Sequence, residues 1–508
     1  MKKICILIIF FVFLISCKDE VFAINLDDKV VNGESLEERV VSAIERRDNY
    51  IVVEDFSITE EDVSQYYVEI LYRHPELFYV SRSIRIFRFP DRSYISTILP
   101  VYEDEESYGG DWFLEMMDKP LGMIDDDMTT LEKILFVHDY LCANLEYGKD
   151  DTSKREYHSI VGVVTEGKVV CEGYSKAFQY YMNQLEIPCR VVVGDMEDGE
   201  AHAWNQVQID GSWYMIDVTH DDPTPDAYGR VCHTHFLVSA EQIPERTWER
   251  NKYHICNSKK YENVFWNNVE SQMIYHDGAW YYVSTDDKNG MNLYRHDFKK
   301  HSLDEKGDVV LPLSEEWIVF GRRNAYWIED CGRIAQFEDK IIYNTPKKIM
   351  QCDFNGENVV CIADETMNDK WISGLKMSGD HLLYQLRADY GYEKEHEKIT
   401  VSMKRNPLSV GMVFKDSESN ASYQVLHSSS SGGTVLYRKS LVRNVRKLVI
   451  PKSVRCDGRN YRVVSVAKNA FQNNENISKV VLPYIIHRKM NQQKRSCFKK
   501  RNNGKLVF

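Results

Sequence analysis

The chain has 508 residues and a formal net charge of −13, and its composition is 43% hydrophobic and 28% charged. This length exceeds what one hydrophobic core usually organises, so we expect several domains. The acidic balance excludes nucleic acid as a partner, and the apolar content excludes bulk disorder.

The N-terminus has the pattern of a signal peptide. Lys2 and Lys3 precede an apolar run from Ile4 to Ile15. This run is shorter than the roughly 20 residues that a membrane-spanning helix needs. We therefore predict a signal peptide over residues 1–16 and an extracytoplasmic location for the rest of the chain.

A cysteine directly follows the apolar run. The sequence Leu14-Ile15-Ser16-Cys17 resembles a bacterial lipobox. The resemblance implies that Cys17 is lipidated and anchors the protein to the cell membrane. Residues 17–50 would then hold a polar tether and a first helix. A cleaved signal without lipidation is the alternative.

Helical patterns come before strand patterns in the next part of the chain. Capping residues and apolar residues at helical spacing predict three helices. These helices begin at Ser35, Thr59 and Thr129. Short strand-like runs follow from Val191 onward. We therefore predict an α+β domain over residues 51–250, with helices first and an antiparallel sheet after them.

A cysteine lies at the predicted start of one amphipathic helix. Cys171 precedes apolar residues that recur at helical spacing from Tyr174 to Leu185. The positive end of a helix dipole stabilises a thiolate and lowers the pKa of the thiol. The free N–H groups there can also form part of an oxyanion hole. Taken alone, this segment fits a buried structural cysteine equally well.

The following hairpin brings a histidine and an aspartate together. Asp210-Gly211 is a turn between a strand that starts at His202 and a return strand that leads to Asp217. In the register of a two-residue turn, His202 and Asp217 are diagonal neighbours on the same face. A loop with an odd number of residues would place them on opposite faces.

A cysteine on a helix, followed by a histidine and an aspartate on adjacent strands, has the order of a papain-like triad. Three sequence blocks resemble the transglutaminase-like superfamily. They are residues 167–174, 202–205 and 210–219. The resemblance implies a papain-like fold with Cys171 as nucleophile, His202 as base and Asp217 as the residue that orients the base.

Other histidines lie near these blocks. Bacterial members of the superfamily commonly carry Trp at the position of His220, and this departure concerns the shape of the pocket rather than the chemistry. His233 and His235 would share one strand face without a third ligand, a pattern more typical of structural histidines than of a metal site. We assign no metal and no cofactor.

Residues 260–405 have the pattern of a β-rich module. A turn followed by aromatic and apolar residues occurs three times at irregular spacing. These segments are residues 277–282, 340–343 and 381–384. The pattern predicts a degenerate, propeller-like arrangement and resembles Tyr-rich β domains found beside surface enzymes.

The C-terminal part carries two similar short segments. Residues 447–451 read KLVIP and residues 479–483 read KVVLP, which resembles the start of a BspA-type leucine-rich repeat array. We predict a partial repeat segment over residues 420–486. Residues 487–508 form a basic tail, to which we assign no function.

The family resemblance implies cysteine-dependent acyl transfer on peptide or glutamine-type amides through a thioester. For a bacterial surface protein, hydrolysis by a peptidase or amidase is favoured over cross-linking. The expected partners are a protein or peptide substrate, the membrane through the lipid anchor, and a cell-wall polymer. The alternative from a different class is a non-catalytic surface scaffold that binds protein or wall glycan.

Overall fold

The computed structural model describes residues 30–482, apart from several gaps. The gaps are residues 104–110, 119, 126, 223, 225, 286–290, 314–331, 368–369, 388–395, 404–407, 430–431, 443–445, 457–458, 469, 472–476 and 478. The predicted signal peptide, the lipidation residue Cys17 and the basic tail lie outside the described residues. None of the described helices has the length and apolarity that would let it cross a membrane.

The chain divides into two compact units. The first consists of Met1–Leu114, Asp126–Lys376 and Tyr384–Lys398, and the second of Glu115–Asp125, Met377–Leu383 and Ile399–Phe508. The predicted domain boundaries remain predictions.

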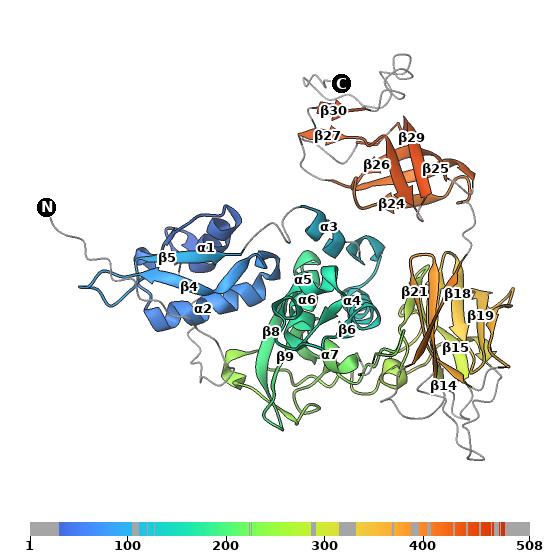
Figure 1. The fold of residues 1–508 in the computed structure, drawn as a ribbon, viewed down its shortest axis with the longest axis horizontal. Coiled ribbons are helices and arrows are strands. Elements are labelled where there is room, and N and C mark those ends of the chain that lie inside the picture. Colours follow the sequence, from blue (N-terminus) through green and yellow to red (C-terminus); the bar gives the residue numbers. More distant parts are fainter. Residues whose placement is uncertain are drawn as a thin grey trace. The chain divides into compact units, whose positions relative to one another are not determined.

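An N-terminal α/β layer has its own buried core, formed by residues between Leu36 and Ile98. Ser35 and Thr59 cap its two helices through capping boxes with Glu38 and Asp62, which confirms both predicted helix starts. The three-stranded sheet has the order β3-β5-β4, and Figure 1 shows β4 beside β5. The elements are β1 (Val30–Val31), β2 (Glu34–Ser35), α1 (Leu36–Glu45), β3 (Ile51–Val52), η1 (Glu54–Phe56), α2 (Glu60–Arg73), η2 (Pro75–Leu77), β4 (Val80–Phe87) and β5 (Thr97–Tyr102).

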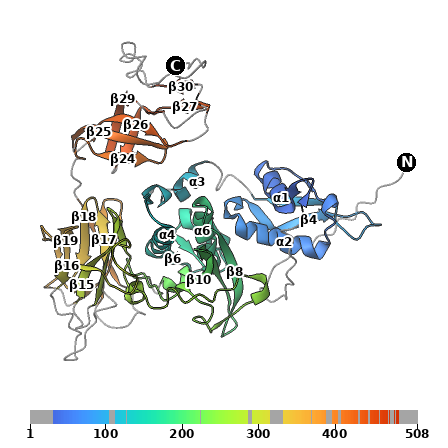
Figure 2. The same ribbon diagram turned by 180° about the vertical axis from the view of Figure 1, so that it is seen from behind.

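The central core places helices beside an antiparallel sheet of order β11-β10-β9-β8-β12. A capping box between Thr129 and Glu132 starts α4 as predicted. Both views show α4 and α6 side by side (Figure 1, Figure 2). The elements are α3 (Asp111–Asp118), η4 (Pro120–Met123), α4 (Thr130–Asn144), β6 (Glu146–Tyr147), η5 (Arg155–His158), α5 (Ile160–Thr165), β7 (Lys168–Val169), α6 (Cys171–Gln184), β8 (Cys189–Met196), β9 (Ala201–Ile209), β10 (Ser212–Ile216), α7 (Val218–Asp221), β11 (Phe236–Val238) and β12 (Arg246–Thr247).

The β-rich region consists of three small sheets, introduced by η6 (Arg250–Lys252) and η7 (Phe265–Asn268). The sheets are β13-β14-β15-β16, β17-β18-β19-β20 and β21-β22-β23. The three predicted aromatic segments supply the second strand of each sheet, β14, β18 and β22. A propeller-like closure remains a prediction. The strands are β13 (Ile274–His276), β14 (Ala279–Thr285), β15 (Met291–His296), β16 (Asp308–Leu313), β17 (Ile334–Phe337), β18 (Lys340–Asn344), β19 (Lys348–Asp353), β20 (Val360–Asp364), β21 (Trp371–Ser378), β22 (His381–Arg387) and β23 (Glu397–Ser402).

The C-terminal strands form a five-stranded sheet of order β24-β25-β26-β29-β28 and a separate pair, β27 and β30. In that pair the two similar C-terminal segments run parallel, with Lys447 opposite Lys479. Stacked repeats would pair in this way, but the repeat assignment remains a prediction. The strands are β24 (Val413–Asp416), β25 (Ala421–Ser429), β26 (Gly432–Ser440), β27 (Lys447–Val449), β28 (Ser453–Cys456), β29 (Arg459–Val466) and β30 (Lys479–Val481).

Candidate active site

Cys171 is the first residue of α6, as the sequence predicts. Two glycines allow the backbone conformation and the close packing at the start of this helix. Gly167 turns the backbone with φ 64°, and a Cβ at Gly173 would collide with the backbone oxygen of Tyr157. The thiol is partly exposed. The first-turn N–H groups of a helix lack intrahelical acceptors, so this position favours a thiolate.

The hairpin has the predicted two-residue turn. Asp210 and Gly211 both have positive φ, 50° and 80°, which is the backbone of a type I′ turn. Ser212 pairs with Ile209, and the ladder continues to Ile216 opposite Asn205. The predicted register is therefore confirmed.

His202 and Asp217 form a direct hydrogen bond. The distance from His202 Nε2 to Asp217 Oδ2 is 2.7 Å, and both side chains are buried. With Nε2–H donating to the carboxylate, Nδ1 is the ring nitrogen left to exchange a proton with a reacting group. The His202 ring also stacks on Trp204, with ring centroids 5.8 Å apart, which fixes its plane.

The strand that carries His202 is tied to the helix that carries Cys171. The Asn205 side-chain amide donates to the Ser175 carbonyl oxygen at 3.0 Å, and the Ser175 hydroxyl donates to the Cys171 carbonyl oxygen at 2.9 Å. These two hydrogen bonds join β9 to the first turn of α6. The three predicted residues therefore belong to elements that pack directly on one another.

Asp217 is ionised. Burial by itself raises the pKa of this carboxyl, but the charge and the hydrogen bond of His202, followed by those of His220, hold it well below its ordinary value. The Arg246 guanidinium donates to the same oxygen at 2.6 Å. A permanently charged, fully buried arginine therefore accompanies the carboxylate that orients His202.

Two contacts of Asp217 were not predicted from the sequence. His220 donates to Asp217 through Nδ1 at 3.0 Å, and its ring meets that of His202 edge to face at 4.7 Å. The sequence marked His220 only as a departure from the family pattern. Arg246 lies on β12 and reaches Asp217 because β12 pairs with β8, a long-range pairing that has no local signal.

Asp222 has a different environment from Asp217. The Tyr174 hydroxyl donates to its carboxyl group. Burial raises the pKa of Asp222 well above the ordinary value. The surroundings of the two carboxyl groups therefore shift their pKa in opposite directions, upward for Asp222 and downward for Asp217.

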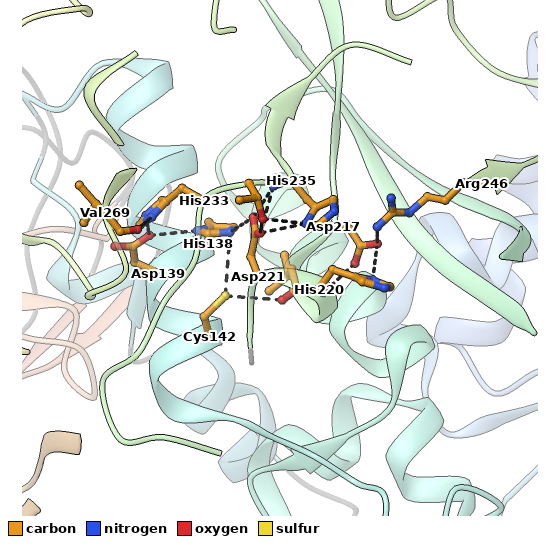
Figure 3. A network of polar contacts seen from close by, with 12 residues as sticks. His138, Asp139, Cys142, Asp217, His220, Asp221, His233, His235, Arg246 and Val269 are labelled. Carbon is orange, nitrogen blue, oxygen red and sulfur yellow. Dashed lines mark hydrogen bonds and ion pairs between the residues drawn. The ribbon is translucent and has the colours of Figure 1, made fainter. Parts of the chain in front are cut away.

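Four buried residues form what we call the histidine–aspartate network: His233, Asp139, His138 and Asp221 (Figure 3). His233 Nε2 and His138 Nδ1 both lie 3.0 Å from Asp139 Oδ1. His138 Nε2 lies 3.1 Å from Asp221 Oδ2. The imidazole of His138 thus faces a carboxylate on each side.

These contacts change the interpretation of His233 and His235. The two residues lie in the turn before β11 rather than on one strand face, so that expectation was wrong. Each contacts its own carboxylate, His233 that of Asp139 and His235 that of Asp221. The reason is that the chain turns between His233 and Phe236 before the strand begins.

Two described groups bring three potential metal ligands within 4.8 Å of one another. One is His138, Asp139 and His233, and the other is His202, Asp217 and His220. In both groups the ring nitrogens face carboxylate oxygens at hydrogen-bonding distance, and in the second the Arg246 guanidinium already occupies the shared oxygen. Hydrogen bonds account for both arrangements, and we assign no metal.

Cys142 provides a contrast to Cys171. Its sulfur lies 3.9 Å from His138 Nε2, so that a second cysteine contacts a His–Asp pair. Burial, followed by the charges of Asp222, Asp221 and Asp139, raises the pKa of the Cys142 thiol well above its ordinary value. Cys142 is therefore a protonated thiol without access to substrate.

The network predicts how stability depends on pH. The folded pKa of Asp221 is about 2, because hydrogen bonds from His138 and His235 outweigh the raising effect of burial. Its contribution is complete above the unfolded pKa of about 4 and is lost as the pH falls toward 2. Burial lowers the pKa of His138, but the two carboxylates outweigh burial and raise it to about 9. Its contribution is complete below about pH 6.5 and is lost as the pH rises toward 9.

The melting temperature should therefore be highest between about pH 4 and pH 6.5. Thermal melts across this range and beyond, for the wild type and for His138→Gln, test the assignment. The variant should lack the part of the alkaline decline that comes from His138. The same decline in both proteins would contradict a charged His138.

Comparisons with known proteins identify a family for the segment that carries the site. The family model of the transglutaminase-like superfamily matches residues 121–218, a segment that contains Cys171, His202 and Asp217. Human kyphoscoliosis peptidase is 22% identical over 110 residues, which cover 19% of this chain and 17% of that protein. The chain thus spans less than a fifth of the length of this curated relative.

Two solved structures are also similar. One is a TGase, which is 15% identical with a TM-score of 0.21 over 33% of this chain and 50% of that chain. The other is a putative cysteine protease from Cytophaga hutchinsonii, which is 15% identical with a TM-score of 0.19 over 34% of this chain and 69% of that chain.

Proposed function

We propose that the segment matched by the transglutaminase-like family model belongs to a papain-like domain that catalyses acyl transfer on peptide or glutamine-type amides. Cys171 is the nucleophile, His202 the general acid and base, and Asp217 the residue that orients His202. The observation that carries this proposal is the 2.7 Å contact between His202 and Asp217 on a strand tied to the first turn of α6.

The reaction proceeds in two steps. The Cys171 thiolate forms a bond to the amide carbon, and the amine leaves with a proton from His202, so that a thioester remains. Water then attacks the thioester and gives a proton to His202, which releases a carboxylic acid and restores the thiolate. N–H groups at the start of α6 stabilise the oxyanion in both steps.

The ionised carboxylate has a defined part in these steps. It holds Nε2–H of His202 and leaves Nδ1 for proton exchange, and it stabilises the imidazolium that accompanies the thiolate. Arg246 keeps Asp217 charged throughout, since a buried guanidinium does not release its proton. The carboxylate therefore orients the base and does not itself take up the proton.

Hydrolysis is the favoured outcome, and transamidation is the variant that uses a primary amine in place of water. Incubation with a peptide library and with glutamine-containing proteins, with and without a primary amine, tests both by mass spectrometry. Hydrolysis gives new carboxyl termini or glutamate in place of glutamine. Transamidation gives products that carry the mass of the amine. Cys171→Ala should abolish either product.

The alternative is a non-catalytic scaffold that binds protein or wall glycan. It predicts that neither product forms and that Cys171→Ala retains binding in a pull-down with cell-wall polymer. What favours the enzyme is that His202 and Asp217 are hydrogen-bonded to each other and that the strand of His202 is joined by hydrogen bonds to the first turn of α6, where Cys171 lies.

We further propose that the protein is extracytoplasmic and anchored to the membrane through lipidated Cys17, with wall polymer as an additional partner. Cys17→Ala should release the protein from the membrane fraction. Cys5→Ala, in the apolar run of the same segment, is the matched control and should leave the protein membrane-bound. A wild-type protein that already fractionates as soluble contradicts the anchor.

A further inference from the structure

The histidine–aspartate network connects the candidate catalytic carboxylate with the segment that leads into the β-rich region. Its contacts with Asp217 begin at Asp221, the last residue of α7. The backbone N–H of Asp221 donates to the Asp217 carbonyl oxygen at 3.2 Å. Because α7 has only one turn, the position of Asp221 sets the position of Asp217, which caps this turn.

Asp221 is in turn held from two sides. Its carboxylate accepts hydrogen bonds from the backbone N–H of His235 at 3.0 Å and from the Thr234 hydroxyl at 3.1 Å. On the other side it meets His138 of α4 at 3.1 Å. The backbone N–H of Asp217 donates to the His235 carbonyl oxygen at 3.1 Å. The turn that carries Asp217 is thus fixed between α4 and residues 234–235.

The other end of the network contacts residues 269–273, directly before β13. The Met273 backbone N–H donates to Asp139 Oδ2 at 2.7 Å. His233 Nδ1 donates to the Val269 carbonyl oxygen at 2.9 Å. The Asp139 carboxylate therefore accepts hydrogen bonds from this segment with one oxygen and from His138 and His233 with the other (Figure 3).

The protons on His138 determine how strongly it holds the two carboxylates. Both nitrogens of His138 face carboxylate oxygens, so both carry protons and the residue is an imidazolium. An imidazolium between two carboxylates attracts both Asp139 and Asp221, whereas a neutral side chain at this position lacks that attraction and leaves the carboxylates to His233 and His235 alone. A shift of residues 269–273 that moves Asp139 therefore moves His138 and Asp221.

We propose that His138 is a positioning residue that couples residues 269–273, at the entrance to the β-rich region, to the orientation of Asp217. This inference rests on the proposed function, because it assumes that Asp217 orients His202 for Cys171. If the coupling is lost, Asp217 orients His202 less precisely toward Cys171, although all three residues are still present.

The pH dependence of Cys171 alkylation by iodoacetamide tests the coupling without a known substrate. In the wild type the rate should be nearly flat from pH 6 to pH 8, because the thiolate is already paired. In His138→Gln the rate should rise steeply with pH, toward the roughly tenfold increase per pH unit of an ordinary thiol below its pKa. Once a substrate is identified, kcat should fall on the order of 10- to 100-fold with KM little changed.

Two controls separate coupling from general destabilisation. His296→Gln removes a buried histidine of β15 that lies outside the network, and it should lower the melting temperature without changing the pH profile. Met273→Pro removes the backbone N–H group that donates a hydrogen bond to Asp139, whereas Met273→Ala keeps this group. Only the proline variant should steepen the profile, and this pair decides the question if His138→Gln does not fold.

The outcomes distinguish this inference from the proposed function. A wild-type Cys171 with the steep profile of an ordinary thiol contradicts the proposed function itself. A flat wild-type profile that stays flat in folded His138→Gln and Met273→Pro overturns the coupling alone and leaves the network a structural one.

Discussion

Iodoacetamide at pH 6 should alkylate Cys171 on the order of 10- to 100-fold faster than Cys361, because the thiolate is the reacting form and pairing with the His202 imidazolium makes it available at that pH. Cys361 is the internal reference, since it is an exposed free cysteine on β20. Cys171 is less exposed than Cys361, so a faster reaction cannot come from access and must come from a larger thiolate fraction. Peptide mapping after limited alkylation measures both rates in one sample.

Two further measurements sharpen this result. Cys142 should remain unlabelled in the folded protein, because it is buried and its pKa is raised. His202→Ala should bring the Cys171 rate down toward that of Cys361, since the thiolate loses its imidazolium partner. If Cys361 reacts first in the wild type, or if His202→Ala changes nothing, the thiolate–imidazolium pair does not exist.

The parts of the site that follow from local sequence were predictable. Asp210-Gly211 specifies a two-residue turn, because both positions need positive φ, and the turn then fixes the register that brings His202 to Asp217. The start of α6 at Cys171 was predictable from apolar spacing. Turn chemistry and helical periodicity act within a few residues, so one sequence is enough to read them.

The residues that surround Asp217 were not predictable in the same way. Arg246 and His138 reach the site from β12 and α4, so their roles depend on how distant segments pack. In the sequence, His138 and Asp139 stand between apolar residues of the segment from Leu135 to Cys142, and no neighbouring residue indicates their partners. The unexpected polarity of two buried helix positions was a signal for a network, but not for its connection to Asp217.

In the β-rich region, too, local elements could be predicted from the sequence, whereas contacts between distant segments could not. The aromatic segments predicted strands, and each became the second strand of its sheet. The hydrogen bond between Trp280 of β14 and Glu132 of α4, at 3.2 Å, follows from no repeat pattern. A strand pattern predicts how a sheet forms, whereas contacts with another domain depend on single side chains that the pattern does not include.

Asp217→Asn should lower turnover on the order of 10³- to 10⁴-fold, because an uncharged amide favours the wrong imidazole tautomer and no longer stabilises the imidazolium. The matched control is Asp222→Asn. Asp222 accepts a hydrogen bond from the Tyr174 hydroxyl, and an asparagine of the same shape keeps an oxygen that can accept it. Its effect on turnover should be less than about tenfold, as expected for a residue outside the reacting groups.

Stability must be measured alongside turnover, because Asp217→Asn also leaves the fully buried Arg246 with less negative charge nearby. Removing one partner of a buried ion pair is destabilising, so the melting temperature of this variant should fall. Turnover is therefore compared at a temperature at which both variants are folded by circular dichroism. The pH profile of Cys171 alkylation should steepen in Asp217→Asn and stay flat in Asp222→Asn. Equal losses of turnover in the two folded variants would show that Asp217 is not the carboxylate that orients His202.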